Sequence, residues 1–277
     1  MITKPLWQEL IQEIEQAGTA ARDYFTSDDT QNEQKADGSV VTAVDHAIEE
    51  VLVRYIRTNF PDDTIVGEEG GEHIGSSSFV WHIDPVDGTD NFLRKIPFCA
   101  ISVARLGDTA EDSFGIVHNP ITGQTFAALM DEGVYENEHV HSLNDVSLGG
   151  RSVLSVCRGK DSWMKSASYN LHKAFGLQFG KGVGLGCCAL ELAYVAANRI
   201  DGVLTFGLNS YDYAAGLFLI QAGGGRVSVY KDDGWKLMEG SLKELCHKHR
   251  ETIFASHAGV HDAALELIGD PRQWADG

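Results

Sequence analysis

The sequence has few basic residues, no paired cysteine motif and no long apolar run. Lysine and arginine number 22 against 40 aspartates and glutamates, which gives a formal net charge of −18 at pH 7. Nucleic acids and anionic membranes repel so acidic a chain, so we expect neither as a partner. The five cysteines include no C-x-x-C pair. This excludes a zinc ribbon and indicates a reducing compartment in place of a disulfide framework.

Targeting signals are also lacking. No apolar run approaches the roughly 18 residues that a membrane span requires. The first residues carry acids where a signal peptide would have its apolar segment. We therefore expect a cytoplasmic protein. A solvated surface accounts for most of the excess acids, but a cation site would need several of them close together.

The order of helical and strand patterns predicts two subdomains. Amphipathic helices are predicted over 4–25 and 44–59, with a polar loop over 26–39 between them. Short β-rich runs separated by Gly, Pro and Asp then indicate a sheet built with hairpins. Further on, strands alternate with helical segments at 162–175, 188–199, 212–222 and 260–268. We expect an α+β N-terminal subdomain over 1–147 and an α/β C-terminal subdomain over 148–277.

The segment WHIDPVDGTDNF combines two carboxylates with a sharp turn. A β-run ends at Asp84, and Asp87 follows three residues later, where both carboxylates can face one side of the turn. Gly88 allows the backbone to turn, and a helix opening at Thr89 would present free N–H groups to an anion. The segment therefore predicts two cation ligands beside a phosphate site. A plain Asp-Pro turn with Asp87 as a helix N-cap is the alternative.

Three more acidic segments have the same double interpretation. Glu68 and Glu69 follow a short apolar strand in IVGEEGG, Asp212 begins a strongly apolar helix in NSYDYAAG, and Asp45 follows Thr42 in DGSVVTAVD. Each could be a loop end or a helix cap. Together they form an oxygen-only set without nearby His or Cys, which favours Mg²⁺ or Mn²⁺ over Zn²⁺. Two such ions can activate water and stabilise the leaving oxygen of a phosphate ester.

These motifs, in this order, resemble those of the inositol monophosphatase family. DGSVVTAVD is similar to the family's DxxVTxxD segment, IVGEEGG to its GEE motif and IDPVDGTDNF to its DPxDGTxNF signature. YDYAAGLFLIQAGG is similar to the second signature, WDxAAGxxLxxxAGG. The resemblance implies a layered αβαβα sandwich, a homodimer, and lithium-sensitive, Mg²⁺-dependent hydrolysis of a small phosphorylated sugar or cyclitol.

The resemblance also implies which residues hold the metal ions. Glu68, Asp84 and the carbonyl of Val86 would hold one Mg²⁺. Asp84, Asp87 and Asp212 would hold a second, and Glu68 would share a looser third.

The resemblance assigns catalytic and substrate-binding roles to further positions. Thr89, oriented by Asp45 and assisted by Glu68, would position and help deprotonate the attacking water. The backbone N–H groups of Gly88 and Thr89 would hold phosphate oxygens. The expected substrate-binding set is Asp87, Gly88, Thr89, Asp212, Cys188 and Thr205.

The sequence departs from the family pattern where the alcohol would bind. Thr205 stands where inositol phosphatases often have a glutamate, and Gly186-Cys187-Cys188 replaces Gly-(Ser/Thr)-Ala. Tyr211 replaces a tryptophan, and Asp90 adds a charge beside the metal ligands. The substrate therefore stays open.

Two alternatives remain. The same chemistry could act on a bisphosphate, such as fructose 1,6-bisphosphate or a 3′-phosphoadenosine nucleotide. Arg94 and Lys95 could then bind the second phosphate, although surface charge is the simpler interpretation of this pair. A regulatory or binding protein that keeps the fold without turnover is the alternative from another class.

Overall fold

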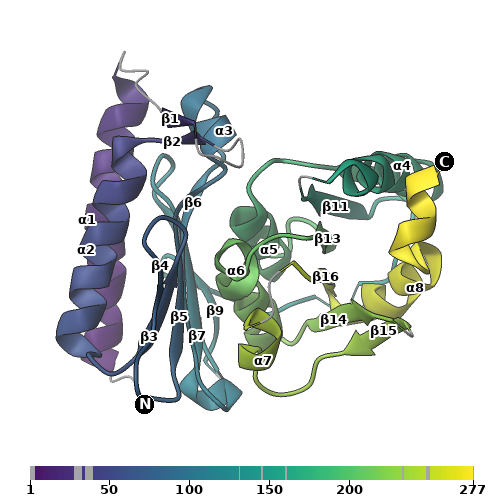
Figure 1. The fold of residues 1–277 in the computed structure, drawn as a ribbon. Helices are drawn as coiled ribbons and strands as arrows, with labels where there is room; N and C mark the ends of the chain where they lie inside the picture. The colour runs from purple at the N-terminus through teal and green to yellow at the C-terminus, as the bar shows by residue number, and fades with distance from the viewer. Residues whose placement is uncertain are drawn as a thin grey trace.

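A computed structural model describes residues 4–27, 33–34, 40–130, 132–144, 146–159, 161–232, 234–247 and 250–276. Two β-sheets alternate with three helical layers across the molecule (Figure 1). Helices α1 (Lys4–Thr26) and α2 (Ala43–Asn59) cover the outer face of the first sheet. Helices α5 (Cys188–Ala196) and α6 (Ser210–Ala222) lie between the sheets, and α4 (Ser162–Gln178) and α8 (Ala258–Ile268) cover the second. The predicted αβαβα sandwich is confirmed.

The two N-terminal helices form as their sequence pattern predicts. Leu10 and Ile14 of α1, and Ile48 and Leu52 of α2, are buried, since their spacing keeps them on one helical face. Helix α2 begins after Thr42, whose side chain and that of Asp45 form a reciprocal capping box. Most of the predicted loop over 26–39 lies outside the described residues, as do residues 37–39 of DGSVVTAVD.

The first sheet has eight strands in the order β10-β9-β8-β7-β6-β5-β3-β4. Neighbours are antiparallel except β3 and β5, which run parallel. Its strands are β3 Thr64–Gly67, β4 Gly71–His73, β5 Val80–Asp87, β6 Ala100–Leu106, β7 Phe114–Asn119, β8 Gln124–Leu129, β9 Gly133–Glu136 and β10 His139–His141. A separate pair joins β1 (Glu33–Gln34) to β2 (Val40–Val41). The parallel contact brings the carboxyl ends of β3 and β5 to one edge of the sheet.

The second sheet has six strands in the order β12-β11-β13-β16-β14-β15. Its elements are β11 Val153–Arg158, β12 Lys181–Val183, β13 Gly202–Phe206, β14 Arg226–Lys231, β15 Gly234–Leu237 and β16 Thr252–Ser256, with α7 at Lys243–Cys246. Strand β11 runs parallel to β12 and β13, and the other pairs are antiparallel. The chain changes sheets between residues 141 and 153, and the subdomain boundary at 147/148 stays a prediction.

The middle helical layer is apolar on all sides because both sheets cover it. Most residues of α5 and α6 are buried. A Cβ on Gly216 of α6 would come within 2.4 Å of Leu192 in α5, and one on Gly115 of β7 within 2.6 Å of the Ala215 carbonyl oxygen. Glycine at these two positions therefore allows α6 to pack closely against α5 and β7. Apolar as α6 is, no helix among the described residues has the length and hydropathy to cross a bilayer.

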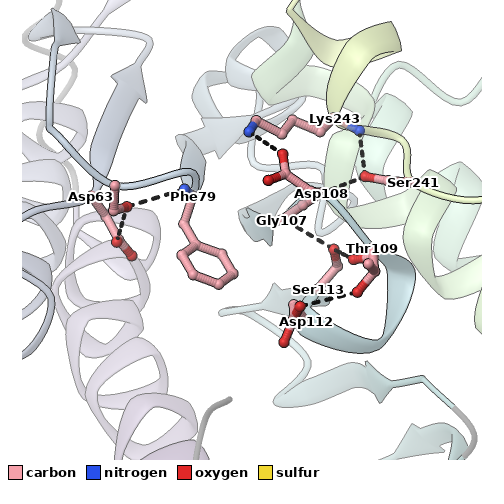
Figure 2. Close-up of polar contacts among 10 residues, drawn as sticks. Asp63, Phe79, Gly107, Asp108, Thr109, Asp112, Ser113, Ser241 and Lys243 are labelled. Carbon is pink, nitrogen blue, oxygen red and sulfur yellow. Dashed lines mark hydrogen bonds and ion pairs between the residues drawn. The ribbon is translucent and has the colours of Figure 1, made fainter.

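Polar contacts near one end of the first sheet tie the two halves together (Figure 2). The Ser241 hydroxyl donates to the Gly107 carbonyl at 2.5 Å, and the Lys243 ammonium pairs with Asp108 at 2.6 Å. Within the first half, buried Asp63 accepts from Arg105 at 2.8 Å. These bonds help to fix how the sheets lie against the shared helices, and thereby where the acidic segments meet.

Candidate metal and phosphate site

The carboxyl end of β5 turns two aspartates to the same side. Residues three apart on a regular strand would point to opposite faces. The pairing of β5 with β6 shifts register between Asp84 and Asp87, so three residues of β5 span two of β6. This bulge adds the one residue needed to bring both carboxylates together. Asp84 is buried, and its Oδ1 accepts the Val86 N–H at 3.0 Å.

The first turn of α6 supplies the third carboxylate. Asp212 Oδ2 accepts the Asn209 N–H at 2.7 Å, which completes a capping box. Asp212 therefore caps α6, as one of the two interpretations predicted. This does not exclude its role as a metal ligand. Asp84, Asp87 and Asp212 each place one carboxylate oxygen within 4.8 Å of those of the other two.

Burial and mutual repulsion make this cluster electrostatically costly when it is ionised. Burial raises the pKa of Asp84 well above its ordinary value, and the charges of Glu68 and Asp87 raise it further. Burial is also the largest cause of the pKa shifts of Asp87 and Asp212. The pKa of Asp87 rises to about 7, and that of Asp212 rises well above its ordinary value. Converging carboxylate oxygens of this kind fit a hard divalent cation, Mg²⁺ or Mn²⁺.

Glu68 reaches the same edge from β3. Its backbone N–H continues the parallel pairing by donating to the Ile83 carbonyl at 3.1 Å. Glu49 of α2 supports the turn that follows, because its carboxylate accepts the N–H groups of Glu69 at 2.9 Å and Gly70 at 2.5 Å. The sequence analysis missed Glu49. An acid on the buried face of an amphipathic helix was the signal that could have found it.

Gly88 and Thr89 lie where the chain leaves β5 and enters the short helix α3 (Thr89–Leu93). Gly88 has φ 84°, and a Cβ there would come within 2.9 Å of Cys187. Neither N–H group donates to another described residue. The Thr89 hydroxyl donates to the Val86 carbonyl at 3.0 Å.

Asp45 and Thr89 are not joined by a hydrogen bond within the described residues. Asp45 Oδ2 instead accepts the N–H of Thr42 at 2.9 Å and its hydroxyl at 2.6 Å. Its other oxygen, Oδ1, is buried and has no hydrogen-bond partner among the residues that the structure describes. Burial raises the pKa of Asp45, and the nearby charge of Glu68 adds to the shift. The predicted orientation of Thr89 by Asp45 stays a prediction, since no direct hydrogen bond joins them within the described residues while Asp45 carries an unused acceptor.

A second buried acid, Glu191 of α5, supports Asp87 from the other half of the chain. Glu191 accepts the N–H groups of Leu185 and Gly186 at 3.0 and 2.9 Å, together with the hydroxyl of Ser155. The loop that these bonds hold leads into the start of α5, where the Ala189 N–H donates to Asp87 at 2.6 Å. Sequence analysis missed Glu191 too, because its place within an apolar helix gave no sign of these contacts.

The acidic cluster and the turn at Gly88 line a cavity of about 670 Å³. Its lining includes Glu68, Asp84, Val86, Asp87, Gly88, Thr89, Asp90, Cys187, Cys188, Tyr211 and Asp212. Thr205 does not line it. Thr205 lies in the middle of β13 between β11 and β16, is fully buried, and donates to the Ile253 carbonyl at 3.5 Å. Its expected contact with substrate is therefore not seen.

Arg94 and Lys95 do not line the cavity either. The Lys95 ammonium donates to the carbonyls of Tyr24 and Ser27 at 2.9 and 3.1 Å, and lies 5.1 Å from the Tyr24 ring centroid. Lys95 thus holds the end of α1 in place, and a contact of this pair with a second phosphate stays an untested alternative.

The fold and the site together define the class: a layered αβαβα protein with converging carboxylates at the end of a central strand. The chain belongs to the inositol monophosphatase family, whose model matches residues 4–264. It is 33% identical over 225 residues to the Nus factor SuhB of Salmonella typhimurium, covering 80% of this chain and 84% of that protein. It is 32% identical over 265 residues to the Nus factor SuhB of Haemophilus influenzae, covering 91% and 98%.

The solved structure of an IMPase from Thermotoga maritima has the same fold. The TM-score is 0.82 at 24% identity, with 99% of this chain and 100% of that chain covered. The match confirms that the layered arrangement extends over the whole described chain.

Proposed function

We propose that the protein is a Mg²⁺-dependent phosphomonoesterase that hydrolyses a small phosphorylated sugar, cyclitol or related alcohol. The observation that carries this proposal is the convergence of Asp84, Asp87 and Asp212 beside Glu68 in one cavity. A capping or turn role explains each acid singly, but not why all of them line one space. Family membership supports the same chemistry.

Five residues would hold the metal ions: Glu68, Asp84 and the Val86 carbonyl for one, and Asp84, Asp87 and Asp212 for a second, with Glu68 shared by a looser third. Bound Mg²⁺, or Mn²⁺ in its place, would lower the pKa of a water and neutralise charge on the phosphate ester. The Val86 carbonyl accepts the Thr89 hydroxyl and has a second lone pair for a cation. Thr89 would therefore lie beside the ion that Val86 contacts.

The chain's own groups would orient the water and the phosphate. The Thr89 hydroxyl oxygen can accept from the attacking water, and the Glu68 carboxylate can take its proton. Asp45 Oδ1, a buried acceptor without a partner, supports an orienting role for Asp45. The unpaired N–H groups of Gly88 and Thr89 would donate to phosphate oxygens. Cys188 would form part of the wall beside the alcohol.

A panel assay tests this proposal. Phosphate release from sugar, inositol and nucleotide monophosphates is followed with malachite green, in millimolar Mg²⁺ or in EDTA. Substrate concentrations of about 0.1 to 1 mM lie at the upper end of common KM values. Release from at least one ester with Mg²⁺, and its loss with EDTA, is expected. Inhibition by millimolar Li⁺ is expected from the family. Silence across the panel, by folded protein that binds Mg²⁺ in calorimetry, would overturn the proposal.

The second candidate is a binding or regulatory member of the family without turnover. The SuhB relatives of this chain carry the name Nus factor, which is not the name of a phosphatase. The full set of converging carboxylates favours the enzyme. The expected partners remain a small phosphorylated substrate and a second copy of the chain in a homodimer, with neither nucleic acid nor membrane.

A further inference from the structure

Three basic side chains line the cavity that holds the acidic cluster. They are Arg158, Lys165 and Arg250, all from the second half of the chain. Arg158 ends β11, Lys165 lies in the first turns of α4, and Arg250 precedes β16. The same cavity is also lined by acids, namely Glu68, Asp84, Asp87, Asp90, Asp161, Glu191 and Asp212, so the three cations are the positively charged part of a mixed lining.

None of the three cations makes an ion pair or a side-chain hydrogen bond within the described part of the chain. Several other cations of the protein are paired: Arg105 binds Asp63, Arg226 binds Asp262 and Lys243 binds Asp108. The three cavity cations are exposed, so their N–H donors are open to solvent and to a ligand that enters the cavity.

The part of the lining that residues 156–172 supply carries net positive charge, because Arg158 and Lys165 stand against Asp161, a formal charge of +1. Arg250 adds a third cation from the segment before β16, while Glu191 and the acidic cluster occupy other parts of the lining. His172 also lines the cavity, but burial lowers its pKa, so it is neutral near pH 7. The Asp161 side chain makes no capping bond to α4, which leaves the first N–H groups of that 17-residue helix uncapped by it.

The backbone conformation at Arg250 also indicates a role for its side chain. Arg250 has φ 66°, a left-handed backbone conformation that is strained for a residue with a Cβ. Its N–H donates to the Leu208 carbonyl at 3.0 Å, which fixes it against the loop that leads to Asp212. Glycine or asparagine would relieve the strain, so arginine at this position indicates a use for its side chain.

We propose that Arg158, Lys165 and Arg250 bind a second anionic group of the substrate, a phosphate or a carboxylate, while the acidic cluster holds the phosphate that is cleaved. This inference rests on the proposed phosphomonoesterase function. It narrows the substrate class to phosphate esters that carry a second anionic group. It places the second anion beside the end of β11, the start of α4 and Arg250, not at Arg94 and Lys95.

The first test compares turnover of matched esters. The pairs are glycerol 2-phosphate with 2-phosphoglycerate, and adenosine 3′-phosphate with adenosine 3′,5′-bisphosphate. The test ratio is kcat/KM for the ester with a second anionic group divided by kcat/KM for its partner without one. It should exceed about tenfold in at least one pair. Arg158→Gln and Arg250→Asn should lower that ratio about tenfold each. Asparagine tolerates the positive φ, so Arg250→Asn removes the charge without new strain.

Matched controls are Arg151→Gln and Lys181→Gln, two exposed cations that do not line the cavity. They should keep the wild-type ratio. A ratio near one in both pairs, or a ratio that all four variants change alike, would overturn the inference while phosphate release itself upheld the proposed function.

The second test needs no turnover. Calorimetry with Mg²⁺ compares alkylphosphonates of three to six carbons with phosphonocarboxylates of the same length, whose C–P bond is not a phosphate ester. At one chain length or more, the carboxylate should tighten binding about tenfold, and Arg250→Asn and Arg158→Gln should abolish the gain. Equal affinity at every length would overturn the inference even if the panel assay failed.

Discussion

Glu49 of α2 holds Gly70 and its neighbour in place: its carboxylate accepts the Gly70 N–H at 2.5 Å and the Glu69 N–H at 2.9 Å. Glu68 precedes these two residues, so α2 fixes the turn that carries a candidate metal ligand. A Cβ on Gly67, the residue before Glu68, would come within 2.6 Å of the Glu49 carboxylate. Glu49 is therefore a positioning residue, packed against the turn too closely for a side chain at position 67.

Replacing Glu49 by glutamine should weaken Mg²⁺ binding more than folding. Glutamine keeps one acceptor oxygen but turns an amide toward two N–H donors, so the turn at Glu68 loses its support. Losses of such supporting contacts cost roughly 10- to 100-fold in metal affinity. Calorimetric Mg²⁺ affinity and the Mg²⁺ dependence of phosphate release check this. Glu50→Gln, on the exposed face of the same helix, is the control. Equal Mg²⁺ affinity in the two variants would contradict the role.

Asp87→Asn should lower kcat/KM by about 100-fold or more, because the second metal loses a charged ligand. Asparagine retains the shape and can still accept the Ala189 N–H. Folding should therefore survive, which circular dichroism and a melting curve check. Glu72→Gln, an exposed acid on β4, should leave the rate unchanged within twofold. A wild-type rate for Asp87→Asn would end the two-metal assignment.

Mg²⁺ alone should stabilise the folded protein. Bringing three like charges together costs stability, and a bound cation offsets that repulsion only in the folded state. At about 100 times the dissociation constant the gain is roughly 2.7 kcal/mol, or about 5 °C or more in Tm. Differential scanning fluorimetry with Mg²⁺ and with Na⁺ at matched ionic strength measures it. Asp84→Asn should raise the Tm of the metal-free protein and remove the Mg²⁺ response. A Tm that Mg²⁺ does not move would contradict a binding site.

The layered fold was predictable because its local patterns agree with its tertiary packing. The helices expected over 4–25 and 44–59 are Lys4–Thr26 and Ala43–Asn59. The helix expected from 212 begins at Ser210, since Asp212 caps it from its third position. Periodicity and capping chemistry locate such elements, whereas the order of strands in a sheet depends on contacts distant in sequence.

The candidate site was predictable only where a motif carried it. Asp84 and Asp87 share a turn, so their proximity could be read from spacing. Glu49 contacts a turn about 20 residues away, and Glu191 contacts a loop behind Asp87, and no local pattern records either contact. Arg158 belongs to a basic run, CRGKDSWMK, which stands out in so acidic a chain and is the sequence signal for the proposed second anion site.

His261 of α8 should make the protein lose stability in mild acid. Its ring nitrogens bond the hydroxyls of Ser228 and Ser256 at 2.8 Å each, and burial lowers its pKa from 6.5 to about 4. A folded-state pKa below the unfolded value means that the unfolded chain takes up the proton first. The contribution is therefore complete above pH 6.5 and falls as pH drops toward 4, by about 2 kcal/mol at pH 5.

Urea unfolding at pH 7.5 and pH 5.0, with Mg²⁺ absent from both buffers, measures this loss. His261→Gln should be less stable than wild type at pH 7.5, because one hydroxyl loses its ring partner, but should lose about 2 kcal/mol less on acidification. The control is His139→Gln on β10, an exposed histidine whose replacement should leave the pH dependence unchanged. Since the acidic cluster is present in all three proteins, its own titration cancels in the comparison. The same acid loss in His261→Gln as in wild type would show that this buried ring does not set the acid limit of the fold.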